Sequence, residues 1–219
     1  MVCKPGCNLC CTQKVYATSI EAYYILDILS EEEIKILEKI SNYPRPKITN
    51  NQTILCYMHG TEPPQEELLK DLKPCPFLDE KGLCKIYERR PLMCRLMASI
   101  VPCSQGMAEL PPFLFQISTI AMQLAENIDI GGVYGNIFDL LKFLHYYKKG
   151  EAEEVPDYLL NNLEVDELPI LPEEKDLRKW VGTLYRTPVE EKITFRDLLR
   201  ELREEFQSYE SLTFLRDII

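Results

Sequence analysis

Histidine and tryptophan are scarce in this chain of 219 residues, which contains two histidines and one tryptophan. The sequence also has no glycine-rich phosphate-binding loop and no Ser/His/Asp set. These absences leave hydrolase and nucleotide-binding functions without support. No run of about 18 apolar residues is present, so we expect no membrane span. The first residues, Met1 to Pro5, have no apolar core, and we therefore expect no secretory signal and a cytoplasmic protein.

An excess of positive charge is absent as well. The 35 Asp and Glu residues outnumber the 25 Lys and Arg residues, and the net charge is -10. Such a field repels phosphate, so we expect no nucleic-acid partner. The negative charge is concentrated in residues 110–219, which hold 21 acidic and 12 basic residues, against 14 and 13 in residues 1–109. This acidic half is expected either to be a solvated surface or to bind a protein partner.

Cysteine is missing from residues 104–219, although the chain has nine. All nine lie in the first half, at Cys3, Cys7, Cys10, Cys11, Cys56, Cys75, Cys84, Cys94 and Cys103. We therefore expect a cysteine-cluster metal-binding module over residues 1–105 and an acidic helical region over residues 106–219, packed on the module as one globular unit.

The pattern of apolar residues predicts a mainly α fold, in which a small irregular cysteine-rich module of short strands and loops packs with a helical C-terminal half. Ser30 and Glu33 form a capping box that predicts a helix start. The apolar run from Thr53 to Met58 predicts a short strand. Helices are expected over residues 113–128, 134–149, 155–163, 173–185 and 194 to about 218. Strands do not alternate with helices, so a parallel α/β fold is not expected.

Three interpretations of the cysteines compete. Disulfides are disfavoured because the count is odd, and because a bond between the neighbours Cys10 and Cys11 is strained. Scattered buried cysteines behave as small apolar residues, which explains Cys56 between apolar neighbours. That interpretation does not explain four cysteines within residues 3–11, beside glycine and proline. Metal or iron–sulfur ligation is therefore favoured.

The spacing of the cysteines supports ligation, because thiolates are the ligands of soft and borderline metals. Cys7 and Cys10 have the spacing of one arm of a zinc knuckle. Cys75 and Cys84 frame a turn, and Cys94 follows ten residues later. A metal bound by all three regions would tie the N-terminus to residues 75–103.

Four thiolates on Zn²⁺ leave a net charge of about -2, which nearby bases can offset. Five bases lie beside the cysteines in the sequence, and their alternative role is a solvated surface: Lys4, Lys85, Arg89, Arg90 and Arg95.

The order of these motifs resembles a known family. The residues that carry the resemblance are Cys3-x3-Cys7-x2-Cys10-Cys11, then Cys75-Pro-Phe-Leu, then Gly82-Leu-Cys84-x-Ile-Tyr87-x2-Arg90-Pro91-x2-Cys94-Arg95. They look like the YkgJ-type cysteine-cluster proteins, zinc- or iron-chelating domains of the CxxCxxCC type, over about residues 1–105. The resemblance implies metal chelation through Cys7, Cys10, Cys11, Cys75, Cys84 and Cys94. It also implies a role for Cys103, which matches a later cysteine of the family, and places Arg90 and Arg95 next to the ligands. Three residues rather than two separate Cys3 from Cys7, so Cys3 departs from the family pattern.

Setting Cys56 aside, eight cysteines fit two four-thiolate zinc sites, or one cubane iron–sulfur cluster and one zinc site. Cys56 and His59 also have ligand-like spacing, but the site is supplied without them. A structural or interaction protein held by metal is one expected function, and a redox or metal-handling protein is another. A third is an iron–sulfur enzyme that modifies a protein side chain, by analogy with flagellin lysine methylases, which carry a similar cluster. No catalytic residue is identified.

The spacing of Cys3, Cys7 and Cys10 also equals the triad of radical SAM enzymes. Those enzymes place the triad in a long barrel of alternating strands and helices, for which a mostly helical chain of 219 residues has no room.

Overall fold

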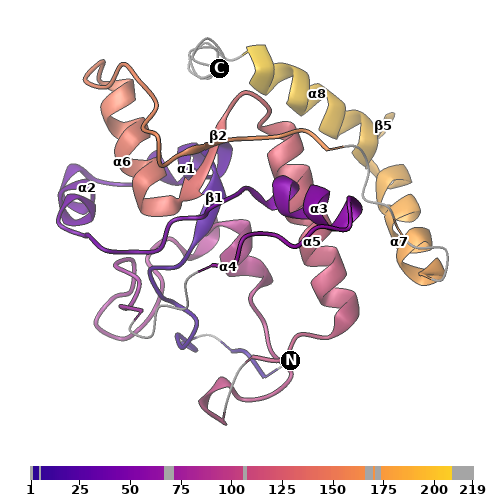
Figure 1. Cartoon of the computed structure of the whole chain (residues 1–219), viewed down its shortest axis with the longest axis horizontal. Helices are drawn as coiled ribbons and strands as arrows, with labels where there is room; N and C mark the ends of the chain where they lie inside the picture. Colours follow the sequence, from indigo (N-terminus) through magenta and orange to yellow (C-terminus); the bar gives the residue numbers. More distant parts are fainter. Residues whose placement is uncertain are drawn as a thin grey trace.

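A computed structural model describes residues 2–4, 6–66, 72–105, 108–165, 170 and 174–208 (Figure 1). Helices form most of the regular structure in these residues, and the strands are short and antiparallel. The predicted mainly α fold is therefore confirmed. None of the helices in the described ranges combines the length and the apolar character that a membrane span requires.

The first half holds β1 and most of the short helices. Their bounds are β1 (Tyr16–Thr18), α1 (Ser19–Leu26), α2 (Glu31–Glu38), α3 (Asn50–Met58), the 3₁₀ helix η1 (Tyr87–Arg89), α4 (Leu92–Leu96) and the 3₁₀ helix η2 (Cys103–Gln105).

The second half holds the longer helices. Their bounds, with those of the intervening strands, are α5 (Pro112–Ile128), β2 (Val133–Asn136), α6 (Ile137–Lys148), β3 (Leu160–Asn161), α7 (Lys175–Arg186), β4 (Pro188–Glu190), β5 (Ile193–Thr194) and α8 (Phe195–Ser208). In Figure 1, α7 and α8 lie along one side of the molecule, away from α1 and α6.

A three-stranded antiparallel sheet, in the order β1-β2-β3, lies beside the main core. Tyr16 pairs with Asn136 and Thr18 with Tyr134, so β2 from the second half is hydrogen-bonded to β1 from the first. Helix α6 packs against α1 and α2, and its Phe138, Leu141 and other apolar side chains are fully buried. The sheet and the core thus draw on both sides of residue 105.

Helix starts follow the capping chemistry of the sequence. The predicted capping box of α2 is present, because the backbone nitrogen of Ser30 donates to Glu33 (2.9 Å) and that of Glu33 donates to the Ser30 hydroxyl (3.3 Å). Asn136 ends β2 and caps α6, accepting from the amide of Phe138 at 3.1 Å.

Three expectations for local structure were wrong. Residues Thr53–Met58 lie in α3 rather than in a strand, since a Thr49/Gln52 capping box starts a helix just before them. The helix expected from residue 134 begins at Ile137, because residues 133–136 pair with β1 and β3 as β2. The helix expected over residues 155–163 is replaced by turns and the short strand β3.

Part of the helix expected over residues 194–218 lies outside the described residues, beyond Ser208. The division of the chain near residue 105 and a protein partner for the acidic half stay predictions.

Candidate metal centre

Three separate segments of the chain carry most of the cysteines to one place. The first segment contains the N-terminal cysteines, and its end is hydrogen-bonded to the start of the second segment. The amide of Gln13 donates to the Lys73 carbonyl (3.0 Å), and the amide of Cys75 donates to the Cys11 carbonyl (2.9 Å). The third segment is α4, which carries Cys94.

The segment from Cys75 to Cys84 is a tight reversal of the chain, as the sequence indicated. Leu78 and Cys84 form an antiparallel bridge across it. One carboxylate oxygen of Asp79 accepts hydrogen bonds from the amides of Lys81 and Leu83, both at 2.8 Å. The reversal brings Cys75 and Cys84 close together, and the charges of Cys84 and Cys11 both act on the Cys75 thiol.

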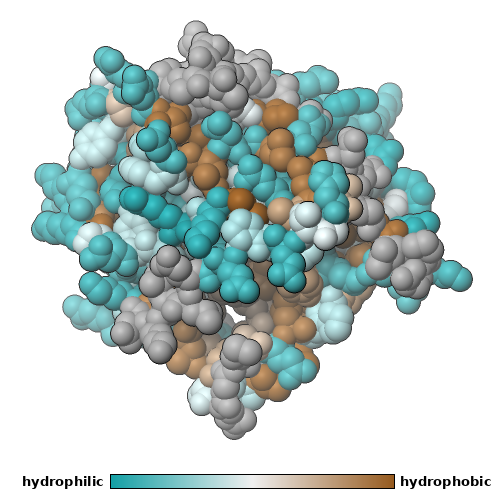
Figure 2. Space-filling view, viewed as in Figure 1, coloured by the Kyte–Doolittle hydropathy of each residue, from teal (hydrophilic) through white to brown (hydrophobic). Residues whose placement is uncertain are grey.

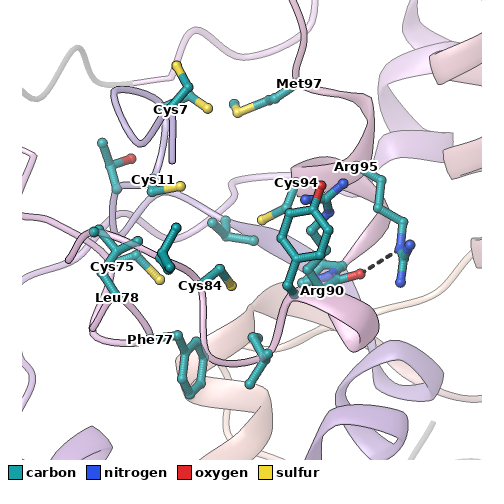
Figure 3. Close-up of a pocket in the computed structure, with 18 of the residues that line it drawn as sticks. Cys7, Cys11, Cys75, Phe77, Leu78, Cys84, Arg90, Cys94, Arg95 and Met97 are labelled. Carbon is teal, nitrogen blue, oxygen red and sulfur yellow. Dashed lines mark hydrogen bonds between the residues drawn. The ribbon is translucent and has the colours of Figure 1, made fainter. Parts of the chain in front are cut away.

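The cysteines surround a cavity of about 620 Å³. Its lining includes seven of them, Cys3, Cys7, Cys10, Cys11, Cys75, Cys84 and Cys94. Apolar residues complete the wall, among them Val15, Phe77, Ile86 and Ile137. Figure 3 shows the thiols of Cys11, Cys84 and Cys94 facing a shared interior, with Cys7 and Met97 at one end. On the face shown in Figure 2, hydrophobic residues gather in the lower part, around a hollow.

The cysteines divide into two groups by burial. The inner group, Cys11, Cys75, Cys84 and Cys94, is half-buried, and Cys75, Cys84 and Cys94 pack against the apolar core. The outer group consists of the exposed Cys3, Cys7 and Cys10, together with the half-buried Cys103 on η2. Cys103 does not line the cavity, yet its charge acts on Cys10 and helps to raise the pKa of that thiol.

Burial and mutual repulsion keep the inner thiols protonated. Burial is the main cause that raises the pKa of Cys75 and of Cys94 to about 12, and that of Cys11 to about 11. The charges of neighbouring cysteines raise these pKa values further; for Cys94 the neighbours include Cys75, Cys11 and Cys84. Several thiolates can therefore coexist here only beside a cation, whose binding releases their protons.

Arg90 and Arg95 both line the cavity, but they make different contacts. Burial raises the pKa of Cys84, and the positive charge of Arg90 partly opposes this rise. The Arg90 guanidinium lies 3.8 Å from the ring centre of Tyr87. Arg95 donates to backbone carbonyls, at 3.0 Å to Arg90 (dashed in Figure 3) and also to Glu88. Arg90 thus places a positive charge near Cys84, whereas the hydrogen bonds of Arg95 stabilise the backbone at Glu88 and Arg90.

Glu21 is a positioning residue that the sequence reasoning missed. One of its carboxylate oxygens accepts a 2.7 Å hydrogen bond from the amide of Leu92, at the start of α4, and the other accepts from the amide of Thr18 at 2.9 Å. Helix α4 carries Cys94, so Glu21 fixes that ligand candidate relative to β1. The sequence signal was a second capping box, formed by Thr18 and Glu21.

The donor chemistry fits a thiophilic metal. Within the described residues, no three His, Cys, Asp or Glu side chains are placed to hold one metal ion. Cys56 lies on α3 and His59 follows that helix, and neither lines the cavity. The structure thus brings together seven of the eight predicted ligand cysteines, with Cys103 next to them.

The thiols that wall this cavity are the donor set of a zinc- or iron-chelating site. Residues 2–112 match the family described as "CxxCxxCC: Putative zinc- or iron-chelating domain", and the chain belongs to this family. A comparison with curated proteins found no match, and neither did a comparison with solved structures.

Proposed function

We propose that the chain is an iron–sulfur protein that binds its cluster through the thiolates of the inner group, Cys11, Cys75, Cys84 and Cys94. The observation that carries the proposal is the lining of one partly apolar cavity by cysteines from three segments of the chain. Four thiolates are the usual ligand set of a cubane cluster.

The placement of the thiols favours a cluster over a single zinc ion. Four sulfurs bound to Zn²⁺ at about 2.3 Å lie roughly 3.8 Å from one another, the edge of that tetrahedron. Among the described residues, no three candidate ligands lie close enough together to hold one ion. The cavity that the cysteines line has a volume of about 620 Å³. An iron–sulfur cluster binds its thiolates on different iron ions, so the thiols need not converge on one point, as the lack of a three-ligand group in the described residues requires.

The residues around the inner group suit a buried, negatively charged cluster. Phe77 and Ile86 are almost fully buried beside it and exclude water from its inner side. Arg90 supplies positive charge next to Cys84. When bound, an iron–sulfur cluster supplies either a one-electron redox centre or a rigid cross-link between segments. The outer group lies nearer to solvent and offers thiols for a second metal site.

The test is metal analysis of protein purified without oxygen. We expect iron and sulfide in equal amounts, with absorbance near 400 nm, in the unaltered chain and in Cys56→Ser, whose cysteine lies outside the cavity. Cys84→Ser and Cys94→Ser are expected to lose the absorbance and most of the iron.

Two results would contradict the proposal. Stoichiometric zinc in a colourless protein would replace the cluster with zinc ligation. Full iron content in both Cys84→Ser and Cys94→Ser would show that the inner group is not the ligand set.

A further inference from the structure

A second cavity, of about 740 Å³, lies at the loop that follows α2. No cysteine lines it. Its wall comes from β1, the loop of residues 40–47 and α6, with Glu66 at its edge. The lining residues are Tyr16, Ile40, Ser41, Asn42, Tyr43, Pro44, Arg45, Lys47, Glu66 and Lys142.

A buried carboxylate organises the cationic side of this cavity. The side chain of Asp139 is 1% exposed. Its oxygens accept hydrogen bonds from the Tyr43 hydroxyl (2.5 Å) and from Nε and Nη2 of Arg45 (2.9 and 3.2 Å). Lys142 donates to the Tyr43 oxygen at 2.5 Å and lies 3.6 Å from Asp139. Two cations are therefore held in place by one negative charge.

The loop that completes the cavity is also fixed to the core. The fully buried side-chain amide of Asn136 donates to the carbonyls of Pro44 and Gln13, both at 2.8 Å. The Arg45 guanidinium lies 3.8 Å from the ring centre of Tyr158. These contacts hold the cationic groups in position before any ligand arrives, which reduces the entropy cost of binding.

The charges at the cavity do not balance. Among the described residues that line the cavity, three are cationic (Arg45, Lys47 and Lys142) and one is a carboxylate (Glu66). Two further charged residues do not line the cavity but pair with these: Lys14 with Glu66, and Asp139 with Arg45 and Lys142. Four positive charges thus stand against two negative ones. Lys47 has no described ion-pair partner and donates only to the carbonyl of Gln65, at 3.0 Å. A surplus of two positive charges in a chain of net charge -10 marks this cavity as a site for a dianion.

We propose that this basic cavity binds the phosphate group of a small phosphorylated molecule. A phosphate monoester carries close to two negative charges at neutral pH, which match the surplus. Lysine ammonium groups bind phosphate as point charges, and Lys47 and Lys142 lie on the wall of the cavity. Tyr16, Ile40 and Pro44 offer an apolar side for the organic part of the ligand.

The experiment is equilibrium dialysis of the metal-loaded chain against inorganic phosphate and against phenyl phosphate, at constant ionic strength. We expect one saturable site per chain with a Kd of about 1 mM or lower for phenyl phosphate, and weaker binding of acetate. Lys47→Gln is expected to weaken phosphate binding about tenfold, because it removes one charge-assisted hydrogen bond. Lys47 contacts only a backbone carbonyl in the described residues, so this variant is expected to fold.

Lys149→Gln is the matched control, since it removes the same charge from a residue that follows α6 and pairs with Glu31 outside the cavity. The proposal is overturned if phosphate shows no saturable binding, if acetate binds equally well, or if Lys47→Gln and Lys149→Gln have the same effect. Metal content is measured on each variant, so that loss of the metal centre is distinguished from loss of phosphate binding.

Discussion

The amide nitrogen of Cys75 donates a 2.9 Å hydrogen bond to the carbonyl oxygen of Cys11, which joins two cysteines that are 64 residues apart in the sequence. This contact belongs to the backbone, so the two thiols are placed by the fold and not only by a bound metal. The effects of nearby substitutions on metal retention can therefore be separated from their effects on folding.

Arg90→Gln is expected to release metal to a chelator several-fold faster than the unaltered chain, because it removes a positive charge beside the thiolates. The reason is that the positive charge of Arg90 favours the thiolate of Cys84. Arg89→Gln is the control, because Arg89 points to the carbonyl and ring of Tyr24 and does not line the cavity. Equal release rates for the two variants would contradict a charge role for Arg90.

Gly82→Ala tests the contact between the turn and the N-terminal loop. Gly82 has φ +75°, and a Cβ there would lie 2.3 Å from the side-chain nitrogen of Asn8. We expect a loss of about 1–2 kcal/mol in urea unfolding from the left-handed backbone, together with reduced metal content. Gly60→Ala has a similar φ of +67° and open space around the Cβ, so it should lose similar stability and keep its metal. Unchanged metal content in Gly82→Ala would show that the Asn8 side chain can move away from the new Cβ without displacing the cysteines.

Asp129 makes the stability of the fold depend on pH. Its carboxylate accepts hydrogen bonds from Ser19 (2.6 Å) and Asn162 (2.8 Å), and burial raises its pKa from 3.8 to about 7. Between these values the folded chain holds a proton that the unfolded chain has lost. Stability therefore falls as pH rises from 3.8 to about 7, by up to about 1.4 kcal/mol per pH unit.

Asp129→Asn is expected to remove this part of the pH dependence, as measured by urea unfolding across that range. Its neutral side chain can still accept from Ser19 and Asn162. Asp27→Asn, at an exposed position, should leave the slope unchanged. A slope in Asp129→Asn equal to that of the unaltered chain would assign the pH dependence to other carboxyls, such as Glu126, whose pKa burial also raises.

Phe138→Ala is expected to lower the free energy of unfolding by about 3–5 kcal/mol, because it empties a fully buried position. The Phe138 ring contacts Phe77, which lies between Cys75 and Cys84 (ring centroids 5.9 Å apart), and Tyr43, which lines the basic cavity (5.6 Å). Phe115→Ala, at a position that is 63% exposed, should change stability by less than about 0.5 kcal/mol. Thermal or urea unfolding of both variants checks the difference.

Local signals in the sequence predicted some helices correctly and gave the wrong type of element at other positions. The Ser30/Glu33 pair started α2 as expected, since a capping box is a property of adjacent residues. The run from Thr53 to Met58 resembled a strand by composition, but the Thr49/Gln52 capping box before it determined a helix. Strand β2 could not be separated from α6 by pattern, because all four of its residues are buried and show no alternation.

The candidate metal centre was predictable from the cysteine spacing and the family resemblance, whereas the grouping of its thiols was not. Cys10 and Cys103 influence each other across more than 90 residues, a proximity that only the folded chain produces. The basic cavity was missed for the same reason. Its central contacts join Arg45 to Asp139, and no local motif connects residues so far apart.

Val15 lines the cysteine cavity, and the next residue, Tyr16, lines the basic cavity. The chain at Val15 and Tyr16 therefore forms part of the wall of both cavities. The backbone carbonyl of Val15 is bonded to the amide of Ile137, and the amide of Tyr16 to the sulfur of Met93, next to Cys94. A shift of the main chain at these two residues would therefore move the wall of both cavities.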